Sequence, residues 1–206
     1  MLALRRSPLP EGQRYAAIVE LEGGAGYRAV FLTGIARHPD GVDLAMATIE
    51  HRPPRLLSLR EKGLRMGASV VSWGYPLSKF QQRADGGRTF ILDPRYLEGY
   101  VTRPFQDDDR GFGVTQAYEL DMPTPEGLSG APLLKMGTTE VVGVVYGTNE
   151  VAIIKHFERV DEEGRREPEV QRVVTFGLAH HTSSLHSLRG PATGDVPLGH
   201  YLRCIP

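Results

Sequence analysis

The stretch at residues 125–134, PEGLSGAPLL, places one serine, Ser129, between two glycines and follows it with a proline and an apolar segment. A serine nucleophile needs an exposed hydroxyl on a tight turn, together with backbone N–H groups that point at the oxygen of the attacked carbonyl. Ser129 can supply one of those N–H groups and Gly127 the other, because Gly127 has no Cβ that would block the substrate's approach. The same residues also suit an ordinary turn between two strands, and the pattern by itself does not separate the two interpretations.

Short apolar runs separated by glycine and proline fill much of the chain and predict many short β-strands. Residues 16–21 and 27–32, joined by a glycine-rich turn, predict a hairpin. Further strands are predicted at residues 44–49, 69–73, 99–101, 141–146 and 173–179. One short helix is expected at residues 182–188. This pattern favours an all-β barrel or sandwich over an alternating α/β sheet.

Two polar segments are expected to be solvated loops. Residues 81–88 are polar and rich in glycine, and residues 158–172 carry dense charge of both signs. Mixed charge is typical of an exposed segment, so neither is assigned a binding role.

Composition limits the partners and the compartment. The chain has 24 Lys and Arg against 25 Asp and Glu, a formal net charge of -1, so we expect neither nucleic acid nor a membrane as a partner. Its one cysteine, Cys204, excludes an internal disulfide. The sequence shows no apolar run of signal-peptide or membrane-span length. A cytoplasmic protein is therefore expected, with the condition that an export signal could precede Met1.

Several short motifs resemble the trypsin-like (chymotrypsin-fold) serine peptidases, particularly the disulfide-free bacterial kind. They are an acid that opens an apolar strand, a Gly-Tyr-Pro turn, the Gly-x-Ser-Gly-x-Pro motif and a late aromatic-Gly-apolar strand. In this sequence they are residues 43–46, 74–76, 127–132 and 176–179. The resemblance covers roughly residues 16–188 in the family's order, and the serine motif is the specific part of it.

The resemblance implies an all-β, chymotrypsin-like double β-barrel with a short C-terminal helix, in which the first barrel is incomplete. It implies one peptidase domain over residues 1–206, with the remainder of the N-terminal barrel in 1–80, the C-terminal barrel and helix in 98–190, and a tail in 191–206. The Gly-Tyr-Pro turn is expected to end a strand of the first barrel.

The resemblance also implies roles for single residues. Ser129 would be the nucleophile, and Asp43 would orient the catalytic histidine. The N–H groups of Gly127 and Ser129 would bind the oxyanion. Four residues after the serine motif would pair with the substrate backbone, namely Val145, Tyr146, Gly147 and Thr148. No cofactor is implied, and no metal site is expected.

Two departures from the family bear on activation and specificity. Leu128 stands before the nucleophile, where the animal digestive enzymes keep an aspartate that captures a newly cleaved N-terminus. Pro123 stands six residues before Ser129, where an acid would select Lys or Arg at the cleaved bond. Neither that activation switch nor that preference is supported.

The catalytic histidine is missing from its expected place. In the family it precedes the aspartate by roughly forty residues, whereas the first histidine here, His38, lies five residues before Asp43. We interpret His38 as part of a surface turn, and five of the later histidines as surface or partly buried residues; these are His51, His180, His181, His186 and His200. We expect a histidine-bearing strand to be encoded upstream of Met1, through a mis-assigned start or a truncated gene.

Two functions follow from these observations. The first is a trypsin-like serine endopeptidase that acts through an acyl-enzyme on Ser129 and is weakly active or inactive as written. The second is a non-catalytic pseudo-peptidase that binds a peptide or protein segment in the same cleft. A third possibility, an α/β-hydrolase esterase, is set aside because Gly130 directly follows Ser129 and no helix follows it.

Overall fold

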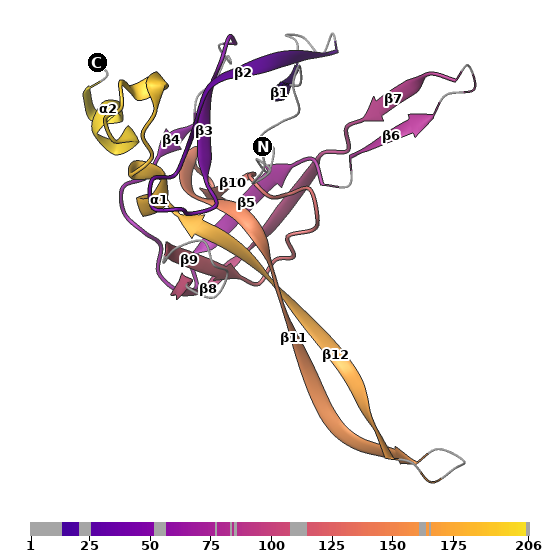
Figure 1. Ribbon diagram of the computed structural model, residues 1–206. Helices are drawn as coiled ribbons and strands as arrows, with labels where there is room; N and C mark the ends of the chain where they lie inside the picture. The colour runs from indigo at the N-terminus through magenta and orange to yellow at the C-terminus, as the bar shows by residue number, and fades with distance from the viewer. Residues whose placement is uncertain are drawn as a thin grey trace.

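The computed structural model describes residues 14–20, 26–51, 57–76, 78–82, 84, 86–107, 115–160, 164 and 166–204. The chain is built mainly from β-strands in these residues (Figure 1). The first seven strands are β1 (Ala16–Glu20), β2 (Tyr27–Arg37), β3 (Ala45–Ile49), β4 (Ser58–Leu59), β5 (Ser69–Gly74), β6 (Lys79–Gln82) and β7 (Arg88–Ile91). The remaining strands are β8 (Arg95–Asp107), β9 (Thr115–Leu120), β10 (Pro132–Lys135), β11 (Glu140–Val160) and β12 (Arg166–His181).

Six of these strands close into a barrel. The sheet runs β10-β5-β8-β9-β12-β11, and an additional β10–β11 pairing joins its two ends. Every pair in this ring is antiparallel. The interior holds a cluster of buried apolar side chains, which are Val70, Val101, Tyr118, Leu120, Met122, Leu133, Val142 and Ala179. Closure removes the unpaired edges that an open sheet would present.

A separate sheet of three antiparallel strands, in the order β1-β2-β3, lies beside the barrel (Figure 1). Its link to the barrel is a second apolar cluster around Val42 and Leu44, which precede β3, and Val141 and Val144 of β11. Leu185 and Leu188 complete this cluster. The all-β fold with a second, smaller sheet agrees with the fold class predicted from the sequence.

The C-terminal segment packs against both parts. Helix α1 (Thr182–His186) follows β12 directly, where the sequence predicts a helix, and α2 (Leu198–Cys204) lies within the predicted tail. Between them, Gly190 lies so close to Ala36 of β2 that a Cβ on it would be 2.5 Å from the Cβ of Ala36. No helix in the described part of the chain is long and apolar enough to cross a membrane.

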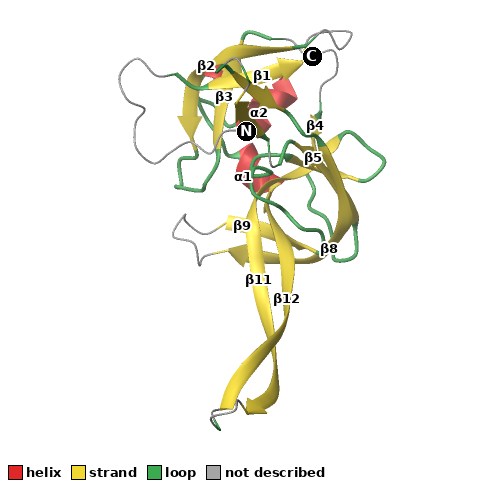
Figure 2. Ribbon diagram, turned by 90° about the vertical axis from the view of Figure 1, so that its right-hand side faces the viewer, coloured by secondary structure: helices red, strands yellow, loops and turns green. Residues whose placement is uncertain are grey.

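Strands β11 and β12 continue past the barrel as a two-stranded arm (Figures 1 and 2). The ladder runs outward from Asn149↔Phe176 to Val160↔Arg166, with register shifts around Ile154. The prediction of a loop at 158–172 is therefore wrong for most of its length, since all of its described residues except Gly164 lie in β11 or β12. The polar segment at 81–88 likewise contains strand residues, because β6 and β7 form a hairpin around it.

The Gly-Tyr-Pro turn also has a different place from the one expected. It follows β5, which pairs with β8 and with β10, so it ends a strand of the closed barrel rather than of the three-stranded sheet. A short apolar strand carries no signal that names its partner strands, and the sequence therefore could not decide this.

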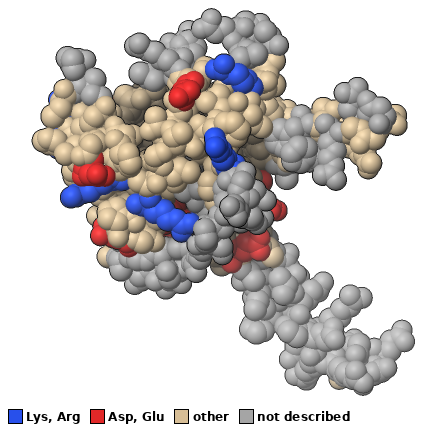
Figure 3. Space-filling model, turned by 45° about the horizontal axis from the view of Figure 1, so that its top comes forward, with Lys and Arg blue, Asp and Glu red and all other residues tan. Residues whose placement is uncertain are grey.

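The described surface on the face shown in Figure 3 is mostly uncharged, with Lys, Arg, Asp and Glu side chains scattered singly or in mixed groups. No single-sign field of the kind that attracts a polyanion is visible on that face.

Candidate active site

The serine motif forms a tight turn at the mouth of the barrel, before β10. The Leu128 N–H donates to the Pro125 carbonyl at 3.0 Å, and the Ala131 N–H donates to the Leu128 carbonyl at 2.9 Å. The Gly130 N–H then reaches across to the Val145 carbonyl of β11 at 2.6 Å. These bonds fix the backbone on both sides of Ser129.

Both glycines of the motif adopt left-handed backbone conformations. The φ angle of Gly127 is +88° and that of Gly130 is +91°, values that side-chain-bearing residues rarely reach. The N–H groups of Gly127 and Ser129 donate to no acceptor among the residues the structure describes. Two backbone donors thus stay available beside one hydroxyl, as an oxyanion hole requires.

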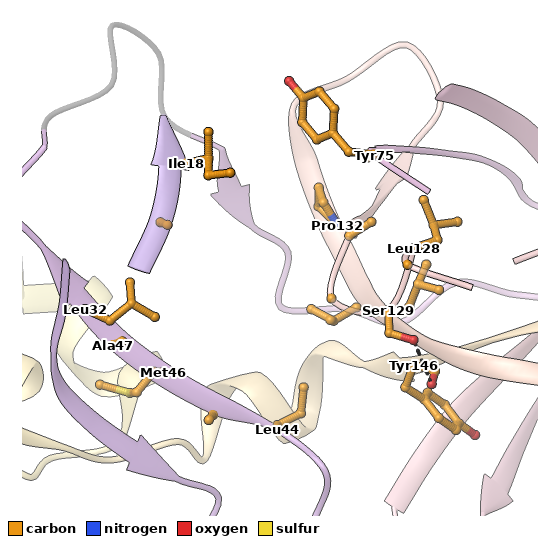
Figure 4. A pocket seen from close by; sticks show the side chains of 18 of the residues that line it. Ile18, Leu32, Leu44, Met46, Ala47, Tyr75, Leu128, Ser129, Pro132 and Tyr146 are labelled. Atoms are coloured by element: carbon orange, nitrogen blue, oxygen red, sulfur yellow. Dashed lines mark hydrogen bonds between the residues drawn. The ribbon is translucent and has the colours of Figure 1, made fainter. Parts of the chain in front are cut away.

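The Ser129 hydroxyl is exposed and donates to the main-chain carbonyl of Tyr146 at 3.3 Å (Figure 4). Tyr146 is the extra residue of a bulge in β11, where the register with β12 shifts between Val145 and Gly147. A bulge of this kind re-aims the backbone locally, and here it brings a carbonyl of β11 to the serine.

A cleft of about 910 Å³ separates the three-stranded sheet from the barrel and contains Ser129. Figure 4 shows Ile18, Leu32 and Met46 on the sheet side, facing Leu128 and Pro132 on the barrel side. Leu128 is buried against Ala131 and Val145, so the wall next to the serine is apolar. A groove with apolar walls and a few convergent polar groups is the usual form of a ligand site.

Asp43 lies on the opposite wall of the same cleft, just before β3, and its side chain is exposed. The structure thus brings Asp43, Gly127, Ser129, Val145 and Tyr146 to one cavity, although Asp43 adjoins the three-stranded sheet and the other four belong to β11 or to the turn before β10.

The other two predicted substrate-binding residues, Gly147 and Thr148, lie farther along β11 and do not line the cleft. They contact Thr124, whose hydroxyl donates to the Gly147 carbonyl at 2.5 Å. The Thr148 hydroxyl donates in turn to the Thr124 carbonyl at 2.8 Å. Pro123, the residue in the expected specificity position, is exposed.

No histidine lines the cleft among the residues that the structure describes. His38 is buried, and its Nδ1 accepts the Asp40 N–H at 3.1 Å. In the neutral ring the proton therefore sits on Nε2, which donates to the Ser187 hydroxyl at 2.7 Å. The Ser187 hydroxyl donates to the Ser184 carbonyl at 3.0 Å. His38 thus joins the turn before β3 to α1, as a structural residue.

Two later histidines also have structural contacts. His181 caps α1, because its Nδ1 accepts the Ser183 N–H at 2.9 Å. Burial lowers the pKa of His181 below its usual value, and the neighbouring His186 lowers it further. The His186 Nε2 lies 3.2 Å from the Arg60 carbonyl. Neither residue faces Ser129 across the cleft.

A side-chain stack that sequence reasoning missed lies behind the serine. The ring of Tyr146 stacks on the buried ring of His180 with 4.1 Å between centroids, and the Tyr146 hydroxyl donates to the carboxylate of Asp107. These contacts hold Tyr146 in place, and its carbonyl accepts the hydrogen bond from the Ser129 hydroxyl. Neither the spacing of Asp107 nor its surroundings in the sequence signals this role.

Comparison with known proteins gives structural matches alone. No model of a known protein family matches the sequence, and no curated protein matches it. Rv3671c from M. tuberculosis, in an inactive form, aligns over 90% of this chain and 74% of its own at 18% identity, with a TM-score of 0.50.

Two further solved structures are similar. The active form of the Rv3671c protease aligns over 77% of this chain and 56% of its own at 18% identity, with a TM-score of 0.48. The HtrA-type protease AlgW, solved with a decapeptide, aligns over 83% of this chain but 42% of its own, at 18% identity and a TM-score of 0.50. Similarity at this level of identity concerns the fold. Together with the closed barrel, the second sheet and the C-terminal helix, it shows that this chain has the fold of the trypsin-like serine proteases.

Proposed function

We propose that the cleft beside Ser129 is the site of a serine endopeptidase. The supporting observation is the turn at residues 127–130, which presents an exposed hydroxyl and two available backbone N–H groups to an apolar cleft. In this proposal the substrate is a peptide or protein segment bound in extended form.

The reaction would follow the usual acyl-transfer course. The Ser129 oxygen attacks the carbonyl carbon of the cleaved bond, and its proton passes to a base. The N–H groups of Gly127 and Ser129 stabilise the negative oxygen that forms. The C–N bond then breaks, the amine leaves with the proton, and water releases the acyl group from the serine. Asp43 would orient the base from the opposite wall.

In this proposal the base is a histidine imidazole, which the described lining of the cleft does not contain. We propose that a histidine-bearing segment outside this chain supplies it. Without this segment, the oxyanion donors and binding would leave a residual rate of roughly 10³-fold over water. The chain alone is therefore expected to bind peptides and to react slowly.

A non-catalytic peptide-binding module is the second candidate. The observation that favours it is the same absence of histidine from the described lining of the cleft. In this case the cleft would hold a peptide beside Ser129 without cutting it.

Labelling with a fluorophosphonate probe separates the two functions. The chain is compared with a version extended upstream by a histidine-bearing strand, and each is also made as the Ser129→Ala variant. The peptidase proposal predicts strong labelling of the extended protein, weak labelling of the chain alone and none of either variant. An extended protein that folds but does not label would favour the binding module, and labelling of the Ser129→Ala variant would exclude Ser129 as the nucleophile.

A further inference from the structure

The outer edge of β11, on the side away from β12, loses its strand partner beside the nucleophile among the residues that the structure describes. Inside the barrel this edge pairs with β10, from Leu134↔Val141 to Pro132↔Val144. The last contacts are those of Val145, whose N–H donates to the Ala131 carbonyl at 3.0 Å and whose carbonyl accepts the Gly130 N–H. The edge then passes Ser129 and continues into the arm (Figure 1).

Beyond the cleft, the arm keeps a regular stretch of strand. From Asn149 to Ile153, β11 pairs residue by residue with β12, and the register shifts only after Ile153. Over this stretch no strand among the described residues pairs with the outer edge. An edge strand presents a row of N–H and C=O groups that can pair with another extended chain. The sequence of this stretch, NEVAI, carries one charged residue, so it has little of the charge that usually protects such an edge.

The root of this arm is held in a fixed direction. Thr124 is buried and is bonded to Gly147 and Thr148 of β11. On β12, a Cβ at Gly177 would lie 2.6 Å from both the Met122 carbonyl and the Thr124 side chain, so the segment before the serine turn crosses the arm closely at this point. The arm therefore leaves the barrel as a braced extension of the strand that passes the nucleophile.

We propose that the outer edge of β11 between Asn149 and Ile153 extends the cleft and binds the substrate by strand addition. This inference rests on the proposed peptide-binding function of the cleft. Because β11 runs away from Ser129, an antiparallel strand added to it runs toward the serine. The arm then holds the substrate residues that precede the reacting bond.

The substrate class follows from this geometry. A peptide that ends at Ser129 reaches Ile153 if it has about eight residues before the reacting bond, one for each β11 position from Tyr146 onward. The preferred substrate is thus a long extended segment, such as a chain terminus or an unfolded stretch, with few charges in its outer part. A peptide of four residues would extend no farther than Asn149, the first residue of the proposed edge.

A shortened arm tests the proposal. Glu150 and Thr175 lie opposite each other, so residues 151–174 can be deleted and the two joined by an Asn-Gly turn, which suits a two-residue hairpin. The probes are a fluorescent ten-residue peptide, Lys-Thr-Ser-Val-Thr-Ser-Thr-Val-Ala-Val, and its last four residues alone. The terminal valine suits the apolar wall beside Ser129. Affinities are measured by fluorescence anisotropy with the intact and the shortened protein.

For the intact protein we expect the long peptide to bind roughly tenfold more tightly than the short one, the gain from two or three additional backbone hydrogen bonds. The shortened protein should bind the short peptide with unchanged affinity, and it should bind the long peptide no more tightly than the short one. Equal affinities for both peptides in the intact protein, or a gain that survives the shortening, would overturn the proposal. If neither peptide binds, the proposed function of the cleft is what fails.

Methylated peptides give the same test without altering the protein. Alternate backbone N–H groups of an extended peptide point to opposite edges, so methylating one alternate set of nitrogens in the outer six residues removes the donors of one edge only. Of the two peptides methylated in this way, only one should lose the higher affinity of the long peptide over the short one. An equal loss of affinity in both methylated peptides would contradict strand addition. A concentration-dependent dimer of the intact protein that the shortened protein does not form would instead assign the edge to a second copy of the chain.

Discussion

The hydroxyl of Ser129 donates to the main-chain carbonyl of Tyr146 at 3.3 Å, and the ring of Tyr146 is held from behind by Asp107 and His180. The orientation of the candidate nucleophile thus depends on a residue of the neighbouring strand and on contacts on the far side of that strand. Packing behind the cleft therefore bears on how the serine is presented.

Gly127→Ala should damage the site more than the fold. Gly127 has a φ of +88°, where a Cβ costs about 1–2 kcal/mol, and relief of this strain would turn its N–H away from the cleft. We expect a loss of fluorophosphonate labelling and of short-peptide affinity. Gly137→Ala is the matched control, because Gly137 has a φ of +74° on a turn with open space around it. It should lower stability similarly and leave labelling unchanged; equal losses of labelling in both variants would contradict the role of Gly127.

Tyr146→Phe should lower stability through Asp107. The substitution leaves the buried carboxylate of Asp107 without the Tyr146 hydroxyl, at a cost of about 1–3 kcal/mol in the free energy of unfolding. Asp107→Asn keeps an acceptor oxygen for this hydroxyl and should cost less. Urea unfolding measures both variants. If Asp107→Asn proves the more damaging change, the bond to Tyr146 is not the main role of that carboxylate.

His38→Ala should reduce stability without changing the chemistry at Ser129. The buried ring bridges Asp40 and Ser187, and its loss leaves a cavity and unpaired polar groups, at a cost of about 2–4 kcal/mol. The rate of fluorophosphonate labelling, measured where the variant is still folded, should match that of the parent chain. A large fall in that rate would instead indicate that His38 acts as the base.

The stability of the protein should fall as the pH drops below about 6.5, through His181. Its pKa in the folded state is lowered by burial and by His186, so the unfolded chain binds the proton more readily. Stability from this residue is fully present above pH 6.5 and is lost as the pH falls toward its folded-state pKa. Protonation of Nδ1 also removes the acceptor for the Ser183 N–H at the start of α1.

His181→Asn provides the control for this effect. Asparagine can accept the same N–H but does not titrate, so thermal unfolding measured between pH 5 and 8 should show a weaker pH dependence. An unchanged dependence would assign the effect to other groups.

Sequence patterns anticipated the turn at Ser129, the hairpin of β1 and β2, the barrel portions of β11 and β12, and helix α1. These are elements in which local chemistry and burial agree: glycines where φ is positive, and apolar runs where a strand crosses the core. The membership of β5 in the closed barrel was missed, because pairing between distant strands depends on the whole fold and leaves no trace in one strand's sequence.

The arm was missed for a different reason. Alternation of apolar and polar residues appears where one face of a strand is packed on a core. A ribbon whose strands pair only with each other has no such requirement, and the charges at residues 158–172 therefore resembled those of a solvated loop. The roles of Asp107 and Thr124 were likewise invisible, since both act through contacts with residues far away in the chain.

Asp43 adjoins the three-stranded sheet and Ser129 adjoins the barrel, and the apolar cluster around Val42 and Leu44 joins these two parts. The distance between the Asp43 and Ser129 side chains consequently depends on how the three-stranded sheet packs against the barrel. A substitution in that cluster that tilts the sheet against the barrel would change the width of the cleft without replacing a residue that approaches the substrate. The reactivity of Ser129 would then depend on packing in the hydrophobic interior.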